Sequence, residues 1–206
     1  MTIQLYTWST PNGRKASIAL EEFGLPYSVH PINITQGEQH HPDFLKISPN
    51  NKIPAILDPD GPDGRPISLF ESAAILFYLA EKTGRFLPED PEVRLEAWQW
   101  LAWQMGNFGP MLGQAHHFRR FASEPHPYAI ERYSNETQRL YNVLDRRLEG
   151  RAFLAGDYSI VDMATFPWAA RYEWHGTDLA DFPNVKRWYD SIAARPAVQR
   201  GMAVPG

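Results

Sequence analysis

The sequence contains no cysteine. Disulfide bonds, thiolate metal sites and a cysteine nucleophile are therefore excluded, because each of them needs a thiol on the chain itself. The adjacent pairs His40-His41 and His116-His117 lack the spacing that lets two rings of one helix bind the same ion. We therefore expect no metal site.

Long apolar runs and a basic surplus are also missing. No segment approaches the roughly 18 uninterrupted apolar residues of a membrane span, and residues 1–5 do not resemble the start of a signal peptide. The formal net charge is −4, and the densest basic segment, residues 116–120, is short. Nucleic acid binding needs a concentrated basic face. We therefore expect neither a nucleic acid nor a membrane partner, and a cytoplasmic location.

The chain has 206 residues, of which 43% are hydrophobic, enough for one large or two small globular domains. Its first part alternates strand and helix signals. Strands are predicted at residues 5–8, 27–32, 53–57 and 67–70, and helices at residues 11–23 and 72–82. The order β-α-β, loop, β-β-α is that of a thioredoxin-like sheet, so we predict an α/β domain over residues 1–84.

The first of these helices has clear start and stop signals. Ser9 or Thr10 offers a hydroxyl cap, and Pro11 suits a first helical position. Gly24 is a typical end, with Pro26 beyond it. A unit of this length predicts two parallel strands joined by a right-handed crossover.

A linker rich in helix breakers is predicted at residues 85–91, and an all-helical domain at residues 92–206. One long helix carries apolar residues from Leu95 to Met105 on one face, and core packing is the expected role of Trp98. A second helix has a regular apolar stripe from Ile130 to Leu148. Ser159 and Asp162 have the spacing of a capping box at the start of a third.

Several short motifs, taken together and in this order, resemble the cytosolic glutathione transferase family. They are TPNG at residues 10–13, SPNNKIPA at 48–55, LFES at 69–72, GPMLGQ at 109–114, PYAIERY at 127–133 and the box at 159–162. The resemblance spans nearly the whole chain. Within the family, the motifs resemble the Nu-class branch of glutathione-dependent disulfide-bond oxidoreductases more specifically. The resemblance implies the glutathione transferase fold, a thioredoxin-like domain followed by an all-helical one, with glutathione as the ligand.

The resemblance also implies which residues bind glutathione, a peptide with two carboxylates and one thiol. Ser72 is expected to hold the γ-glutamyl carboxylate at a helix N-terminus, with Glu71 meeting the ammonium group; an ordinary helix cap is the alternative. Pro54 is expected to be cis, exposing the backbone of Ile53 to the peptide; a trans proline at a strand start is the alternative. Two more side chains are expected beside the glycine end, or else plainly solvated: Lys52 and Gln39.

Residues 10–13 carry the chemistry in this interpretation. In thioredoxins the matching loop holds two cysteines at a helix N-terminus, which lowers the thiol pKa. Here the Thr10 hydroxyl and the Asn12 amide are expected to donate to the glutathione sulfur, which makes them the candidate catalytic residues. Lowering a thiol pKa from about 8.5 to about 6.5 takes roughly 2.7 kcal/mol, which a helix dipole and one or two such hydrogen bonds can supply. Tyr6 and Ser9 are alternative donors.

The pattern favours a glutathione-dependent disulfide reductase. Family members that conjugate electrophiles use a tyrosine or serine hydroxyl near this position, whereas this chain has Thr10 and Asn12. Three alternatives stay open: a glutathione S-transferase acting on electrophiles, a peroxidase acting on organic hydroperoxides, and a non-catalytic glutathione-binding regulator.

Two further expectations rest on the resemblance. Arg132 resembles a residue that contacts a second glutathione or the disulfide form, and an ion pair with Glu131 or Glu136 is the alternative. The protein is expected to be a homodimer in which the first helices of the second domain pack on the partner's first domain. The apolar character of residues 98–111 agrees with such an interface.

Overall fold

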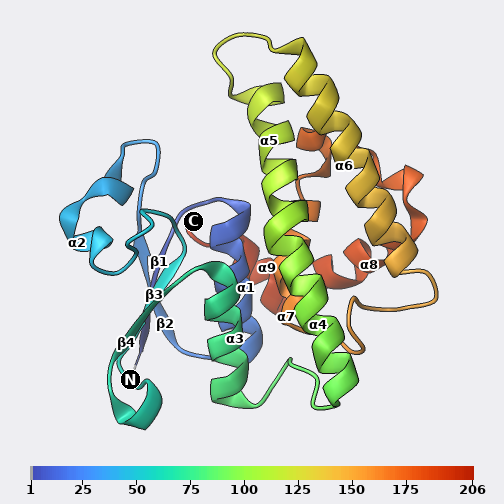
Figure 1. The fold of residues 1–206 in the computed structure, drawn as a ribbon. Coiled ribbons are helices and arrows are strands. Elements are labelled where there is room, and N and C mark those ends of the chain that lie inside the picture. Colours follow the sequence, from blue (N-terminus) through green and yellow to red (C-terminus); the bar gives the residue numbers. More distant parts are fainter. Residues whose placement is uncertain (1) are drawn as a thin grey trace. The chain divides into compact units, whose positions relative to one another are not determined.

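The computed structural model describes residues 2–206 (Figure 1). The chain divides into two compact units, one formed by the residues up to Arg85 together with Ala194–Gly206, the other by Phe86–Ala193. The division predicted from the sequence, 1–84, 85–91 and 92–206, stays a prediction. Residues 194–206, which it assigns to the helical domain, group with the first unit in the structure.

Four strands form the sheet of the first unit, in the order β2-β1-β3-β4. They are β1 (Ile3–Thr7), β2 (Tyr27–Pro31), β3 (Ala55–Asp58) and β4 (Ile67–Phe70). β1 pairs in parallel with β2, and β3 pairs antiparallel with both β1 and β4. The short connection between β3 and β4, which contains the 3-10 turn η2 (Pro62–Gly64), permits only an antiparallel pair. The predicted thioredoxin-like order is confirmed.

Helices lie on both sides of this sheet (Figure 1). α1 (Pro11–Phe23) and α3 (Ser72–Thr83) cover one face, and the 3-10 turn η1 (Glu38–His40) with α2 (Pro42–Leu45) lies on the other. Apolar side chains of β1, α1, β3 and α3 form the core between the sheet and its helix pair, and they are fully buried: Leu5, Leu20, Ile56, Ile75 and Leu79. Because α1 and α3 both begin at the end of a strand, their N-termini are fixed relative to the sheet.

The last helix, α9 (Pro196–Met202), packs against α1. The buried Ser17 hydroxyl donates to the Gly201 carbonyl over 2.7 Å. A β-carbon at Gly201 would lie 2.5 Å from the Cα atom of Ile18, so only glycine permits this approach. Two arginines form ion pairs with α1 at 2.6 Å each: Arg195 with Glu22 and Arg200 with Glu21.

The second unit is helical. Its helices are α4 (Pro91–Trp103), α5 (Gly109–Arg120), α6 (Pro127–Arg147), α7 (Ile160–Ala169) and α8 (Pro183–Ala193), with 3-10 turns η4 (Tyr172–His175) and η5 (Leu179–Asp181). α5 and α6 lie side by side (Figure 1). On α6 the stripe predicted from the sequence is buried at Thr137, Leu140 and Leu144, and continues to Leu148. This confirms the helical period read from residues 130–148.

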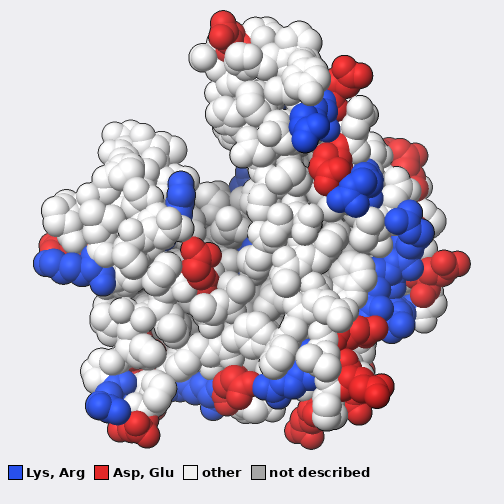
Figure 2. Space-filling model, viewed as in Figure 1, with Lys and Arg blue, Asp and Glu red and all other residues white. Residues whose placement is uncertain are grey.

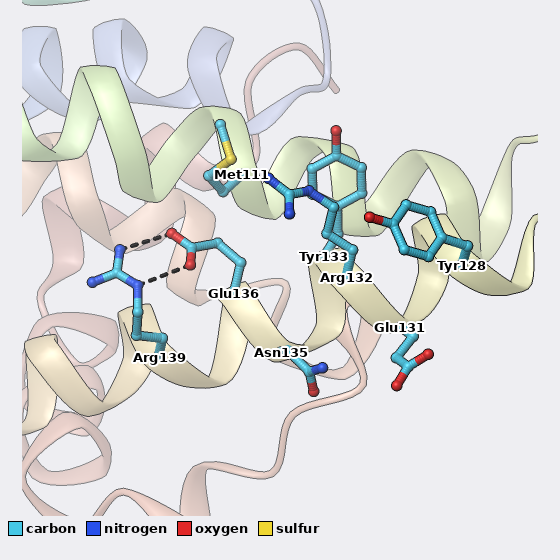
Figure 3. Close-up of a pocket in the computed structure, with 8 residues that line it drawn as sticks. All are labelled: Met111, Tyr128, Glu131, Arg132, Tyr133, Asn135, Glu136 and Arg139. Carbon is cyan, nitrogen blue, oxygen red and sulfur yellow. Dashed lines mark hydrogen bonds and ion pairs between the residues drawn. The ribbon is translucent and has the colours of Figure 1, made fainter.

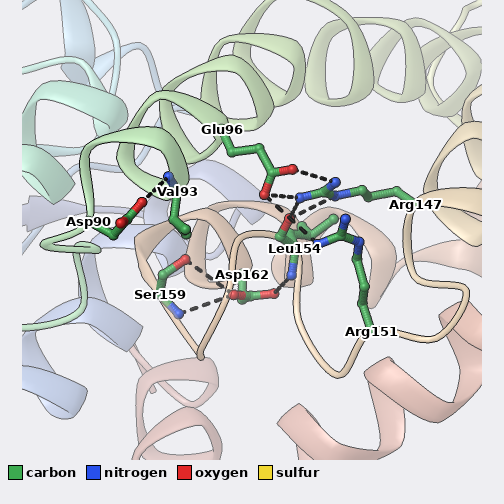
Figure 4. Close-up of polar contacts among 8 residues, drawn as sticks. All are labelled: Asp90, Val93, Glu96, Arg147, Arg151, Leu154, Ser159 and Asp162. Carbon is green, nitrogen blue, oxygen red and sulfur yellow. Dashed lines mark hydrogen bonds and ion pairs between the residues drawn. The ribbon is translucent and has the colours of Figure 1, made fainter.

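A buried polar network holds the start of α7 (Figure 4). The Asp162 carboxylate accepts from the backbone amides of Ser159 and Leu154, both at 3.1 Å. It also accepts from the Trp188 ring N–H at 2.8 Å. The Ser159 hydroxyl accepts from the Val161 amide at 3.3 Å. Capping box and carboxylate together satisfy a helix start that has no access to water. The predicted box is confirmed.

The long helix expected from residue 95 onward is interrupted. A π-helical segment, η3 (Gln104–Phe108), separates α4 from α5. Leu95 and Trp98 both precede this segment, and the buried residues of α4 are Ala97 and Leu101, so the residues from Leu95 to Met105 do not form one buried face. Trp98 is 46% exposed and Leu95 54%, whereas Leu101 is buried. The expected core role of Trp98 is therefore wrong.

Charged side chains of both signs are interspersed on the face shown in Figure 2. Within residues 2–206, no helix is both long enough and apolar enough to cross a membrane. The same residues contain no group of three or more histidine or acidic side chains arranged to hold a metal ion.

Candidate functional site

A cavity of about 250 Å³ opens in the first unit where α1 and α3 begin. Backbone and side chains from three segments meet there, although they are far apart in the sequence. The lining residues are Asn12, Ser48, Asn50, Lys52, Ile53, Pro54, Phe70, Glu71 and Ser72. Six of the predicted site residues are thus brought together: Asn12, Lys52, Ile53, Pro54, Glu71 and Ser72.

The N-terminus of α1 forms one wall of this cavity. Thr10 is the N-cap residue, and its hydroxyl oxygen accepts from the Gly13 amide at 3.0 Å. That bond uses a lone pair and leaves the hydroxyl proton able to donate. A β-carbon at Gly13 would lie 2.5 Å from the Thr7 hydroxyl oxygen and closer still to the Trp8 carbonyl, so glycine is required for α1 to begin this close to β1.

Asn12, the second residue of α1, is half-buried and lines the cavity. Thr10 is also half-buried, but it is not among the lining residues. Pro11 between them has no amide N–H, and its ring fixes a backbone conformation that suits the first turn. The positive end of the α1 dipole is therefore presented beside the Asn12 amide.

The N-terminus of α3 forms the opposite wall. Glu71 stands at the N-cap position with φ 68° and ψ 117°, and its own side chain makes no cap hydrogen bond to the first turn. A positive φ is unfavourable for a residue with a β-carbon and is found where the surrounding structure imposes it. Asn50 donates its side-chain amide to the Glu71 carboxylate over 3.2 Å, and Ser72 is 7% exposed. The first turn of α3 thus presents backbone N–H groups, a hydroxyl and a carboxylate at one place.

The loop before β3 forms the third side. The Ser48 hydroxyl donates to the Lys52 carbonyl over 2.7 Å and closes this loop. The Ile53–Pro54 peptide bond is cis. Pro54 is buried and Ile53 half-buried, while Lys52 is exposed. The hydrogen bond between Ser48 and Lys52 therefore fixes the loop that holds the Ile53 backbone at the cavity.

Three other candidates lie outside the set of lining residues. Gln39, on η1, has its side-chain amide 3.3 Å from His40, whose other ring nitrogen is 3.2 Å from the Asn51 amide. The Tyr6 hydroxyl donates to Gln4 at 2.9 Å. Ser9 is exposed, and its hydroxyl oxygen accepts from Arg14 at 3.1 Å.

A separate cavity of about 610 Å³ lies in the second unit, between α5 and α6 (Figure 3). Arg132 is one of its lining residues, with Met111 from α5 and Tyr128 and Tyr133 from α6. Nearby, the Arg139 guanidinium forms two hydrogen bonds with Glu136, at 2.7 and 2.8 Å. The Arg139 hydrogen bonds lower the pKa of Glu136, and the charge of Arg132 acts on this carboxylate in the same direction.

Sequence reasoning missed three lining residues. Asn50 and Ser48 lie within the motif at 48–55 but were given no role, and Phe70 precedes Glu71 directly. Asn50 fixes Glu71 and Ser48 fixes the loop, so both act through hydrogen bonds within the chain. The motif at residues 48–55 could have indicated both residues, because it places several polar side chains directly before a strand.

Two family models match the chain. Residues 10–82 match the N-terminal domain of glutathione S-transferase, and residues 111–196 match its C-terminal domain. The chain belongs to the glutathione S-transferase family. The cavity lies within the first matched region, and Arg132 lies within the second.

Relatives within the glutathione S-transferase family cover nearly the whole chain. The disulfide-bond oxidoreductase YfcG of Escherichia coli is 52% identical over 202 residues, covering 97% of this chain and 94% of YfcG. A glutathione transferase structure from Pseudomonas putida, with one glutathione disulfide bound per subunit, is 48% identical with a TM-score of 0.95, covering 100% of this chain and 92% of that one. One from Burkholderia graminis, with two glutathione molecules per subunit, is 49% identical with a TM-score of 0.93, covering 99% and 88%.

Proposed function

We propose that this chain is a glutathione-dependent disulfide reductase. The thiolate of bound glutathione attacks one sulfur of a disulfide, forms a mixed disulfide and releases the other sulfur as a thiolate. A second glutathione attacks the mixed disulfide, so two glutathiones and one disulfide give glutathione disulfide and two thiols. The observation that carries this proposal is the cavity at the N-termini of α1 and α3, in a chain without cysteine.

The cavity has the groups needed to bind the γ-glutamyl end of glutathione. The first turn of α3 favours an anion, because its backbone N–H groups point outward along the helix dipole. We assign the γ-glutamyl carboxylate to Ser72 and the ammonium group to the Glu71 carboxylate, which lies one residue before it. Ile53 binds the peptide backbone in this arrangement. Lys52 and Gln39 are assigned to the glycine carboxylate.

The sulfur then lies beside the N-terminus of α1, where Asn12 and Thr10 donate to it. Asn12 lines the cavity, and the hydroxyl proton of Thr10 is not used by its cap bond to Gly13. A thiolate at this place is stabilised by the helix dipole and by both donors. Glutathione serves as the reacting thiol and is consumed as substrate, while the chain supplies position and charge.

The second glutathione is assigned to Arg132. The Pseudomonas putida and Burkholderia graminis proteins each bind two glutathione moieties per subunit, in one case joined as the disulfide. A guanidinium can bind a carboxylate with two hydrogen bonds. The exposed Arg132 side chain, at a cavity of about 610 Å³, is suited to this role.

We also propose that the protein is a cytoplasmic homodimer. Two large apolar side chains three residues apart on α4 are exposed, Leu95 at 54% and Trp98 at 46%, and an adjoining pair of this kind supports a partner for this helix. Sedimentation at micromolar concentration tests this: a dimer mass is expected, and a monomer mass contradicts the proposal.

The decisive experiment measures glutathione-dependent reduction of a small disulfide and the fate of the protein. Because the chain has no thiol, treatment with iodoacetamide followed by its removal should leave the activity intact. Mass spectrometry during turnover should detect glutathione disulfide and no glutathionylated protein. Full activity with mercaptoethanol in place of glutathione would contradict the proposal, since that thiol has nothing for Ser72 or Ile53 to bind.

A variant test separates this function from its alternatives. Asn12→Ala should lower disulfide reductase activity more than tenfold and leave glutathione affinity within a few-fold, because it removes a donor to sulfur and no carboxylate contact. Turnover of a chlorodinitrobenzene-type electrophile far above that of disulfides would favour a conjugating transferase. Glutathione binding without either activity would favour a regulator. If Asn12→Ala is fully active and Tyr6→Phe is inactive, the donor is Tyr6.

A further inference from the structure

Lys15 is a buried lysine on α1. Its side chain is 1% exposed, although lysine is almost never fully buried in proteins. Removing an ammonium group from water is costly unless negative charge and hydrogen bonds compensate for the lost hydration. A position of this kind indicates that the charge has a role there.

The place of Lys15 on α1 relates it to the cavity. It lies three residues after Asn12, so the two side chains share one face of the helix. Long side chains in a helix lean toward the N-terminus and cover the preceding turn. The Lys15 chain therefore extends toward the turn of Asn12, which lines the cavity.

An electrostatic interaction links Lys15 to the opposite wall. Burial lowers the pKa of Lys15 to about 7, and the negative charge of Glu71 acts in the other direction. The Glu71 carboxylate is also held by Asn50 and lines the same cavity. Lys15 is thus within the electrostatic range of a group that the cavity exposes, and its charge state is balanced near neutral pH.

Other charged groups on the elements around α1 already have partners at other places. Glu21 and Glu22 pair with Arg200 and Arg195 at the C-terminal end of α1. Arg14 donates to Ser9. On α3, Lys82 pairs with Asp58, and Glu81 is exposed near the far end of the helix. Glu71 is the carboxylate whose charge acts on Lys15.

We propose that Lys15 is a positioning residue whose buried ammonium group stabilises the negative charge of bound glutathione, the thiolate above all. This inference rests on the proposed function. It adds a full positive charge to the helix dipole and the donors Asn12 and Thr10. It also requires that binding of an anionic glutathione and protonation of Lys15 favour each other, because each stabilises the other's charge.

Calorimetry can test this coupling without any reductase activity. The probe is S-methylglutathione, which keeps both carboxylates and has no thiol to ionise, titrated into the full chain in two buffers of different ionisation enthalpy. The wild type should take up a fraction of a proton per site near pH 7.5. Lys15→Met should lose most of this uptake and keep only the small part that comes from the ligand's own amino group, which Glu71 holds as an ammonium. Lys46→Met, an exposed lysine of the same unit paired with Asp43, is the matched control and should behave as the wild type.

A spectroscopic readout tests the effect on sulfur. The ultraviolet absorbance of the bound thiolate, followed against pH, should give a thiol pKa about one unit higher in Lys15→Met, a tenfold loss of thiolate below that pKa. Lys15→Arg, which keeps the charge, should restore at least part of the shift. Affinity for S-methylglutathione should change less than the thiolate fraction, whereas a merely structural role would lower both together.

The outcomes are separable. Equal proton uptake in the wild type and Lys15→Met, or an unchanged thiol pKa, overturns the proposal. Should Lys15→Met not fold, the wild type alone decides, because proton uptake must pass through a maximum between pH 6 and 8.5, and a flat profile overturns it. If the wild type does not bind S-methylglutathione at all, the proposed function itself has failed.

Discussion

Two helices of this protein begin with a serine and an acidic residue, and they use them in different ways. At the start of α7, Ser159 and Asp162 form a closed capping box, with the carboxylate of Asp162 bound to two backbone amides and the Trp188 ring N–H. At the start of α3, Glu71 precedes Ser72, has a positive φ, and makes no cap hydrogen bond with its own side chain. The first helix start is satisfied within the chain, and the second is open toward a cavity.

The difference shows how the same chemistry serves stability in one place and ligand binding in another. A closed box is buried, so every polar group must find a partner within the chain. At an open helix start the backbone N–H groups can bind an anion, and the surrounding structure holds one residue in a strained backbone conformation. Substitutions at α7 should therefore change the free energy of unfolding, and substitutions at α3 should change glutathione affinity.

The largest effect is expected for Asp162→Ala. It removes the acceptor of four buried donors, namely the Leu154 and Ser159 amides, the Ser159 hydroxyl and the Trp188 ring N–H. Each donor left without a partner costs about 1–3 kcal/mol, so a loss of about 3–5 kcal/mol in unfolding free energy is expected. Denaturant titration measures it. A loss below about 1 kcal/mol would show that water replaces the carboxylate and that the box is not closed.

Acid stability should also depend on the helical unit. Burial and the nearby charges of Arg171 and Arg120 lower the pKa of His116 to about 4. Burial, together with His116 and two nearby arginines, lowers the pKa of His175 to about 3. Both rings stay neutral in the folded protein, whereas the same histidines of the unfolded chain bind protons below about pH 6.5. The stabilisation of the folded state is therefore complete above that pH and is lost as the pH falls toward 4. Burial raises the pKa of Asp162 to about 6, which acts in the opposite direction over the same range.

The two histidines outweigh the one carboxylate, so the free energy of unfolding should fall between pH 6.5 and 4, on the order of 4 kcal/mol. Thermal unfolding at several pH values checks it. His116→Gln should flatten the profile, and His126→Gln, an exposed histidine of the same unit, is the control. A profile with the same slope in wild type and His116→Gln would contradict the assignment.

A matched pair of serine substitutions sharpens the comparison. Ser72→Ala should raise the dissociation constant of glutathione about tenfold, equivalent to about 1.4 kcal/mol, and change unfolding by less than 1 kcal/mol. Ser159→Ala should do the reverse, with about 1–2 kcal/mol lost from stability and glutathione affinity unchanged. Calorimetric binding and denaturation of both variants measure the four quantities. Equal effects on affinity would remove the distinction between the two helix starts.

The smallest effect is expected for Thr10→Ala, because Thr10 combines both uses. Its oxygen caps α1 by accepting from Gly13, and its proton is assigned to sulfur. Loss of the cap should cost about 1 kcal/mol of stability. Reductase activity should fall less than in Asn12→Ala, since Asn12 lines the cavity and Thr10 does not. A larger loss in Thr10→Ala, measured as kcat with stability controlled, would make Thr10 the main donor.

Much of the fold was predictable because local chemistry agrees with it. Thr10 and Gly24 mark the ends of α1, and Ser159 with Asp162 marks the start of α7. The structure disagrees in the helix expected from residue 95 onward. A π-helical segment ends it at Gln104, and Trp98 is exposed because the buried residues of α4 are Ala97 and Leu101.

The site divides in the same way. The motifs at residues 10–13, 48–55 and 69–72 are visible in the sequence. Their resemblance to a known family predicts a binding role for Asn12, Ile53, Glu71 and Ser72. The contribution of Asn50 was not visible, because its role is a hydrogen bond to Glu71 across 21 residues. Lys15 was equally hidden, since a lysine on a helix is normally solvated and only packing reveals its burial.

The sequence by itself determined the order of strands and helices, the caps that begin and end them, and the absence of any thiol of its own. These features depend on residues that are neighbours in the chain. Only the tertiary structure decided that two helix N-termini and a loop enclose one cavity, that Glu71 adopts a positive φ, and that Lys15 loses its water. Those features depend on the desolvation and close packing of segments up to 60 residues apart, which no local pattern encodes.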